Sequence, residues 1–152
     1  MSKANKIPKA TDLKLTDFLC FAIYSANLSF GKAYKPILDA LGLTYTQYIT
    51  MIALYEDGNQ TVGGLGEKLV LESNTLTPIL KKLEAMGYVT RQRDSADERQ
   101  VLVGLTAEGK ALREKANSDA LSEACGLSFD EFAEARHAVL KLRNNLNKAL
   151  KK

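Results

Sequence analysis

The hydrophobic period changes between residues 73 and 105, and this change limits the possible folds more than any other pattern in the sequence. In the run NTLTPILKKLEAM, apolar residues recur at helical spacing, with Ser73 as the expected cap and Gly87 as the stop. From residue 88 the pattern alternates, and YVTRQR, a polar turn DSADE and RQVLVGL are typical of a two-stranded hairpin. Another helix, capped by Thr61 and running to about Leu71, directly precedes this region. A helix pair followed by a hairpin predicts a winged helix-turn-helix.

Capping residues and apolar spacing predict further helices on both sides of this region. Before it we expect a long helix over residues 13–31, a short helix from Pro36 to Gly42, and a helix capped by Thr46 that ends near Asp57 and Gly58. After the hairpin, Thr106 opens another helix, and Ser128 with Glu131 forms the capping box of the last one. The predicted fold class is mainly α with a small β-hairpin wing.

The composition is that of one folded domain. The chain has 152 residues, 45% hydrophobic and 26% charged, which leaves room for a core and excludes a disordered chain. It has no apolar run near the ~20 residues that span a bilayer and no signal-peptide pattern, so we expect a cytoplasmic protein without a membrane partner. His137 is the only histidine, and Cys20 and Cys125 lie far apart in the sequence, so we expect no zinc site and no cofactor. In a reducing compartment these two cysteines are either inert or redox-active.

Organisation, rather than charge, indicates contacts with DNA, because the net charge of +3 equals that of residues 1–14 alone. In a helix-turn-helix the second helix enters the major groove with its N-terminal residues at the base edges. Small polar side chains stand at that end, two lysines follow one turn later, and the wing carries two arginines and an aspartate. The candidate contacts are Ser73, Asn74, Thr75, Thr77, Lys81, Lys82, Arg93, Asp97 and Arg99. The alternative is that Ser73 only caps its helix and that the lysines form a solvated face.

Helix 13–31 is apolar most of the way round and therefore needs partners on several sides, and a second copy of the chain is a reasonable partner. Cys20 lies on this helix. A cysteine thiolate can attack a peroxide oxygen, and with no histidine near in the sequence, phenolic hydroxyls are the available hydrogen-bond donors. The alternative is that Cys20 is an inert core residue and that the nearby tyrosines are packing aromatics.

The run GLGEKLVLESNTLTPILKKLEAMGYVTRQRDSADERQVLVGLTAEG resembles the DNA-binding half of MarR-type repressors, most of all in DERQVLVGLT. The resemblance implies a homodimer that sets two recognition helices on a pseudo-palindromic operator. It also implies a single MarR-like chain over residues 1–152. In that division, residues of about 46–105 bind DNA, whereas about 13–45 and 106–152 supply dimerisation helices.

The run LCFAIYSANLSFGKAYKPILDALGLTYTQY resembles the organic-hydroperoxide-sensing OhrR branch of that family. This resemblance implies that hydroperoxides oxidise Cys20, that Tyr34 and Tyr45 of the other subunit bond to its sulfur, and that Tyr24 lies nearby. Cys125 stands where the two-cysteine subtype has a resolving thiol. The implied mechanism is oxidation of Cys20, a bond to Cys125 of the other chain, and release of DNA.

Two other functions are compatible with the same residues. A MarR-type repressor released by a phenolic or lipophilic ligand would leave the cysteines incidental. A thiol peroxidase would need a substrate pocket with an activating base, which the sequence does not indicate, so we expect no enzyme.

Overall fold

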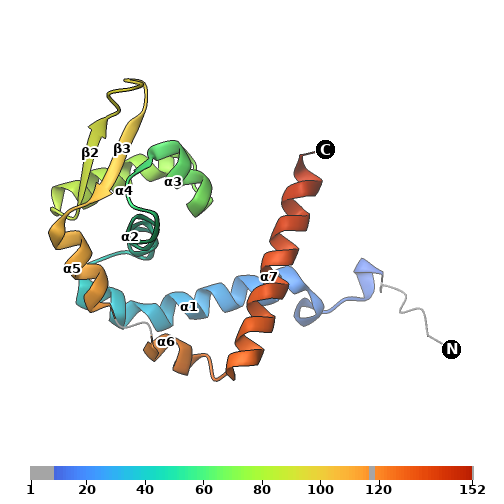
Figure 1. Cartoon of the computed structure of the whole chain (residues 1–152). Helices are drawn as coiled ribbons and strands as arrows, with labels where there is room; N and C mark the ends of the chain where they lie inside the picture. The colour runs from blue at the N-terminus through green and yellow to red at the C-terminus, as the bar shows by residue number, and fades with distance from the viewer. Residues whose placement is uncertain (1–8, 117–118, 152) are drawn as a thin grey trace. The chain divides into compact units, whose positions relative to one another are not determined.

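Hydrophobic spacing and capping residues set most element boundaries in the structure, a computed structural model that describes residues 9–116 and 119–151. The described elements are, in order, 3₁₀ turns η1 (Ala10–Asp12) and η2 (Leu15–Asp17), helices α1 (Leu19–Leu41) and α2 (Tyr45–Asp57), strand β1 (Gln60–Thr61), helices α3 (Val62–Leu69) and α4 (Ser73–Ala85), strands β2 (Val89–Arg93) and β3 (Val101–Leu105), and helices α5 (Ala107–Lys115), α6 (Asp119–Ala124) and α7 (Phe129–Leu150) (Figure 1). A first unit ends at Ala116 and a second unit follows it.

The predicted winged helix-turn-helix is confirmed in the first unit. α3 and α4 form the helix pair, and β2 and β3 form an antiparallel hairpin in which Arg91 pairs with Val103 and Arg93 with Val101 (Figure 1). The two-residue strand β1 adds to the other edge of β3, which gives the strand order β1-β3-β2. The sequence did not predict β1, because two residues are too few to show an alternating pattern.

The core of this unit joins α2, α3, α4 and the hairpin. In α4 the spacing of Leu76, Leu80 and Leu83 places all three side chains on one face, and all three are fully buried. They belong to one apolar cluster with residues of the neighbouring elements, among them Met51, Leu54, Leu65, Val89 and Val103. The core therefore fixes α4 relative to the wing while leaving its opposite face exposed.

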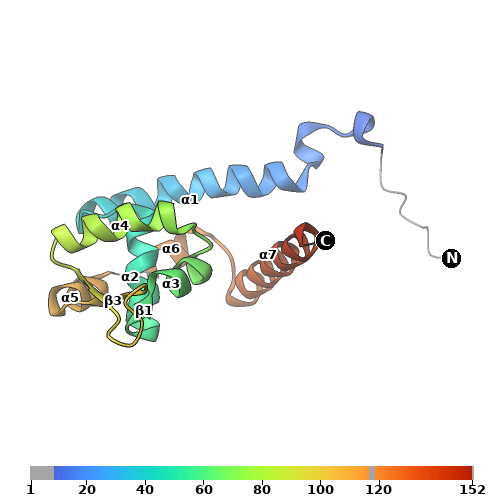
Figure 2. The ribbon, with the colours of Figure 1, turned by 90° about the horizontal axis from the view of Figure 1, so that it is seen from above.

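The prediction of two helices over residues 13–31 and from Pro36 to Gly42 is wrong, since α1 runs without interruption from Leu19 to Leu41 with Pro36 inside it. A proline inside a helix removes one backbone hydrogen bond, but the residues on both sides still favour helix. An ion pair at 2.8 Å joins Lys35, just before the proline, to Asp39, one helical turn later, and this spacing favours helix. Gly42 ends the helix in the left-handed conformation, as predicted. The N-terminal half of α1 extends beyond the other helices of its unit (Figure 1 and Figure 2).

Three predicted caps are confirmed. Thr61, Thr106 and Ser128 each accept a hydrogen bond from a backbone N–H of the first helical turn, and Ser128 forms a complete capping box with Glu131. Gly58 ends α2, and Gly87, with φ of 82°, follows the end of α4.

Two predicted caps are wrong. Thr44, rather than Thr46, caps α2, because its hydroxyl accepts from Gln47 N while the Gln47 side chain accepts from Thr44 N. Ser73 does not cap α4, because Leu76 N donates to the Glu72 carbonyl and the helix starts one residue earlier than predicted. The turn before it is tight: Leu71 N donates to the Gly66 carbonyl, and helix α3 therefore stops at Leu69, short of the predicted end near Leu71.

The second unit consists of α6 and α7, of which α6 was not predicted. Large apolar side chains of α7 are open to solvent in the single chain, including Phe129 at 87% and Leu150 at 84% exposure. Within the described ranges no single helix is long and apolar enough to cross a membrane. Among the residues that the structure describes, one pair of helices, α1 with α2, reaches that length and hydropathy together, but it is bent by 71°.

Candidate functional site

The first turn of α4 presents small polar side chains to solvent. Ser73, Asn74 and Thr75 are exposed, whereas Thr77 is half-buried and its hydroxyl donates to the Ser73 carbonyl at 2.8 Å. Leu76 and Leu80 are buried in the core and hold this part of α4 in place, so the backbone that carries the exposed side chains is fixed. Lys81 and Lys82 are exposed further along the helix. The structure thus gathers all six of the predicted α4 residues on or beside its solvent face.

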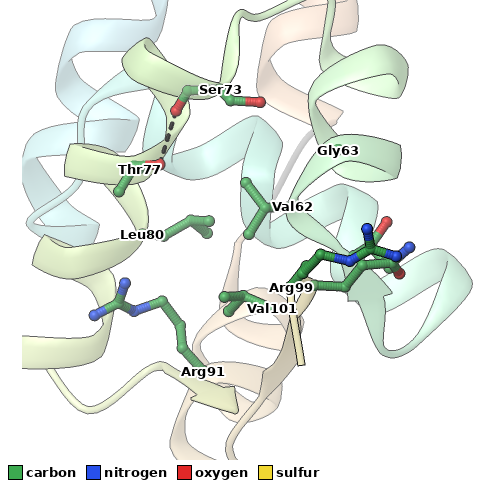
Figure 3. A pocket seen from close by; sticks show the side chains of 10 residues that line it. Val62, Gly63, Ser73, Thr77, Leu80, Arg91, Arg99 and Val101 are labelled. Carbon is green, nitrogen blue, oxygen red and sulfur yellow. Dashed lines mark hydrogen bonds between the residues drawn. The ribbon is translucent and has the colours of Figure 1, made fainter. Parts of the chain in front are cut away.

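A hollow of about 360 Å³ separates the start of α4 from the wing. Val62, Leu80 and Val101 point into its middle, and polar side chains, including Ser73 and Thr77, surround them (Figure 3). The guanidinium groups of Arg91 and Arg99 lie on opposite sides of this hollow rather than converging on it (Figure 3). The helix and the wing therefore form two separate polar edges across an apolar groove.

Arg91 ties the wing to α4 and was not among the predicted site residues. Its Nη2 donates to Glu84 Oε1 at 2.9 Å, and this ion pair is partly buried on the arginine side. The bond to Arg91 holds the pKa of Glu84 below its usual value. The alternation of side chains along β2 could have identified Arg91, because it places Val89, Arg91 and Arg93 on the same face of the strand.

The wing turn is braced by its own charged residues. Asp97 Oδ1 accepts from the backbone N–H of Arg99 at 3.2 Å and from its Nε at 3.1 Å, so the predicted acid does hold the arginine. The Arg99 side chain is nevertheless 92% exposed. Arg93 Nη1 donates to the Glu98 carbonyl at 2.9 Å, which closes the same turn from the strand side.

Cys20 is exposed near the N-terminal end of α1. It lies in an open hollow of about 340 Å³ with Leu15, Phe18, Phe21 and Tyr24, whose exposed lining is entirely apolar. The rings of Phe21 and Tyr24 are 6.4 Å apart. The thiol is thus surrounded on this chain by apolar side chains, with Tyr24 close by as predicted.

Tyr34 and Tyr45 lie together in a different place. Their ring centroids are 5.2 Å apart, and both line a second hollow, of about 390 Å³, with Asn27, Leu28, Phe30 and Gly31. Cys20 and Tyr34 are on the same continuous helix, and at about 1.5 Å per residue they are separated by roughly 21 Å along its axis. Within one chain, therefore, the two tyrosines cannot donate to the Cys20 sulfur.

Cys125 belongs to the second unit, in the short turn between α6 and α7. It is half-buried, and Gly126 follows it in the left-handed conformation with φ of 62°. This agrees with the predicted break between helices. In the ranges that the structure covers, no three His, Cys, Asp or Glu side chains gather in a way that holds a metal ion.

Known proteins match this chain over most of its length. The family model described as transcriptional regulator SarA/Rot matches residues 32–116. The organic hydroperoxide resistance transcriptional regulator of Bacillus subtilis is 46% identical over 108 residues, which cover 71% of this chain and 74% of that protein. Reduced AbfR bound to DNA has a TM-score of 0.80 at 34% identity, covering 94% of this chain and 99% of that one, and AbfR is a protein of Staphylococcus epidermidis. AbfR with its disulfide formed has a TM-score of 0.64 at 34% identity, covering 93% and 96%.

Proposed function

The chain belongs to the SarA/Rot family of transcriptional regulators, which have the MarR-like winged helix, and we propose that it is a homodimeric repressor that senses organic hydroperoxides through Cys20. The observation that carries the sensing part is the separation of Cys20 from the Tyr34–Tyr45 pair along one helix. Because Cys20 cannot reach these two tyrosines within its own chain, it can meet them only in a dimer, where the tyrosines belong to the other chain.

In this proposal, DNA lies along the start of α4 and the wing. The exposed amide of Asn74 suits an adenine edge, and the exposed Ser73 and Thr75 hydroxyls suit bases or phosphates. Lys81 and Lys82 neutralise phosphates, while Arg99, held by Asp97, enters the minor groove. Arg93 acts by keeping the wing turn closed. The match to reduced AbfR, which was solved bound to DNA, supports this orientation of the winged helix.

Dimerisation is assigned to residues of about 13–45 and 106–152, and DNA binding to about 46–105. The support for this division is exposed apolar surface on both terminal parts. Leu15, Leu19 and Leu28 around α1 are each at least half exposed in the single chain, and so are Phe129 and Leu146 of α7. Soluble monomers rarely expose so much large apolar surface, and a second copy of the chain would cover it.

The chemistry starts at the Cys20 thiolate. It attacks one peroxide oxygen of the hydroperoxide, the O–O bond breaks, and the sulfur becomes a sulfenic acid while the organic part leaves as an alcohol after taking up a proton. Hydrogen bonds from Tyr34 and Tyr45 of the partner subunit stabilise the thiolate before the attack. The apolar walls formed by Phe18 and Phe21 favour an organic hydroperoxide over hydrogen peroxide, because an organic group gains from leaving water.

Cys125 of the partner subunit then resolves the sulfenic acid. Its thiol displaces the hydroxyl from the Cys20 sulfur, which forms one S–S bond and releases one water molecule. A disulfide requires Cα atoms within about 7 Å, so closing the bond moves the backbone that carries Cys125, which lies in a turn rather than inside a helix. That movement changes the spacing of the two recognition helices and weakens binding to DNA. The match to AbfR in a disulfide form supports this step.

One observation favours a second candidate, a repressor released by a phenolic or lipophilic ligand. The hollow of about 390 Å³ beside Tyr34 and Tyr45 combines aromatic walls with phenolic hydroxyls and an amide, a lining that suits such a molecule. Salicylate that raises the melting temperature of a Cys20→Ser, Cys125→Ser protein, and that releases its DNA, would support this candidate.

The test of the proposed function is DNA affinity before and after treatment with cumene hydroperoxide. The probe is a duplex selected by the reduced protein from a random pool. Wild-type protein should lose affinity on treatment and regain it with dithiothreitol, whereas Cys20→Ser should bind equally well before and after. Cys125→Ser should form the sulfenic acid but no dimer band on a non-reducing gel. A Cys20→Ser protein that still responds to hydroperoxide contradicts the sensing assignment.

A further inference from the structure

Asn27 lies midway between the two halves of the proposed sensing site. Cys20, Asn27 and Tyr34 follow one another at intervals of seven residues, so they share one face of the uninterrupted helix α1. The same face contains Gly31, and the structure places Asn27, Gly31 and Tyr34 around one hollow. Ile23, Leu28 and Phe30 lie on or beside this face of α1 and are exposed in the single chain. Asn27 is thus a polar residue in the middle of an apolar face.

Two-fold symmetry fixes what Asn27 meets. If Cys20 faces the partner subunit's Tyr34, then symmetry makes Tyr34 face the partner subunit's Cys20, and the two α1 helices run antiparallel. The axis then passes beside the residue halfway between positions 20 and 34, which is position 27. Asn27 therefore faces Asn27 of the partner subunit. Gly31, which has no side chain to keep the helices apart, lies one turn from this crossing.

We propose that the Asn27 side chains of the two subunits hydrogen-bond to each other at the dimer axis and fix the register that brings Cys20 to the partner subunit's Tyr34. This inference rests on the proposed function, since it uses the pairing of these two residues. An amide is both donor and acceptor, so two of them across an axis can satisfy each other. In the part of the chain that the structure describes, no hydrogen bond engages the Asn27 amide, which leaves it available for that partner.

The apolar residues alone do not select this register. A face with a seven-residue repeat packs almost as well when one helix slides by a full repeat. The slide would move Asn27 opposite the partner subunit's Cys20 or Tyr34 and separate the thiol from its donors. A buried amide without its partner disfavours those registers, and single asparagines at helix interfaces fix register in this way at some cost in stability.

Cysteine cross-linking tests the position of the axis without hydroperoxide or DNA. In a Cys20→Ser, Cys125→Ser protein, Asn27→Cys should form a disulfide-linked dimer in diamide, because the two copies of position 27 are adjacent in the proposed register and the disulfide traps that register even without the amide. Ser29→Cys is the matched control, since position 29 is exposed on the same helix but points to another side. It should cross-link at least ten times more slowly. Equal rates at the two positions, or faster linking at position 29, overturn the proposal.

A second experiment tests the role of the amide. In a Cys125→Ser protein that keeps Cys20, Tyr34→Cys should cross-link to Cys20 of the partner subunit in diamide. Adding Asn27→Leu should lower this yield several-fold, although sedimentation should still show a dimer. An unchanged yield means that Asn27 does not set the register. If both cross-links form as expected but hydroperoxide leaves DNA affinity unchanged, the interface stands and the proposed sensing function fails.

Discussion

Removing the phenol hydroxyls of Tyr34 and Tyr45 should slow the oxidation of Cys20 while leaving the dimer intact. Phe substitutions keep the two rings, whose centroids are 5.2 Å apart, and delete only the donors. Because the rings are adjacent, both hydroxyls can serve one sulfur of the partner subunit. A hydrogen bond to a charged group contributes about 1.5–3 kcal/mol, and about 1.4 kcal/mol corresponds to a tenfold change in rate. At the lower end of that range, each single variant should react roughly ten times more slowly, and the double variant roughly a hundred times more slowly.

The assay is the second-order rate constant for cumene hydroperoxide in a Cys125→Ser protein, where oxidation stops at the sulfenic acid. Tyr55→Phe is the matched control, because the Tyr55 hydroxyl donates to Glu114 Oε1, away from the sensing residues. It should react at the parental rate. A Tyr34→Phe, Tyr45→Phe protein that also reacts at the parental rate would refute the reasoning and make these two residues packing aromatics.

Three further predictions concern DNA binding, acid stability and backbone strain. Arg99→Ala should weaken binding to the selected duplex by about 1–3 kcal/mol. Lys81→Ala should mainly reduce the slope of log affinity against log salt concentration, by about one unit. Unchanged affinity for Arg99→Ala would contradict the placement of the wing. Hydrogen bonds with Ser128 lower the pKa of Glu131. The ionised Glu131 side chain therefore stabilises the start of α7 fully above the usual carboxyl pKa of 4.5, and this stabilisation is lost as pH falls through the lowered pKa. Glu131→Gln should remove this acid dependence from amide exchange at the start of α7. Val70→Gly should stabilise the first unit by up to about 1 kcal/mol in urea unfolding. Val70 is 64% exposed and has φ of 57°, so glycine removes backbone strain that exceeds the entropy it adds to the unfolded chain. A loss of stability would show that this turn is not strained.

The winged helix-turn-helix was predictable because each part has a strong local signal. Leu76, Leu80 and Leu83 repeat at helical spacing, and the alternation through Val89 and Val103 marks the hairpin. The residues that the structure brings to the start of α4 were predictable for the same reason, since their position follows from the helix and its turn.

The errors arose where tertiary context decides the outcome. The sequence around Pro36 permits either a break or a continued helix, and only the whole of α1 shows which is formed. Thr44 and Thr46 are both good caps, and the Gln47 side chain selects the first of them. Arg91 was missed because its role depends on Glu84, which belongs to another element.

The proposed sensing site is the part that one chain cannot complete. Tyr24 lies beside Cys20 in the same hollow, which the spacing of one helical turn predicts. The role of Tyr34 and Tyr45 was inferred from the family resemblance alone, and their adjacent rings support a shared role. In the proposed dimer, their approach to Cys20 depends on the second subunit, so neither the spacing of residues nor a single chain could test it.

Mixed dimers show whether Cys20 pairs with the tyrosines of the other subunit. In one mixed dimer, the first chain has Cys20→Ser and the second has Tyr34→Phe and Tyr45→Phe, so the remaining thiol faces intact tyrosines. In the other, all three substitutions are on one chain and the partner is unchanged, so the remaining thiol faces two phenylalanines. We predict that the first dimer reacts with cumene hydroperoxide at the parental rate per thiol and the second roughly a hundred times more slowly. The reverse order, or equal rates, would contradict a site shared between subunits.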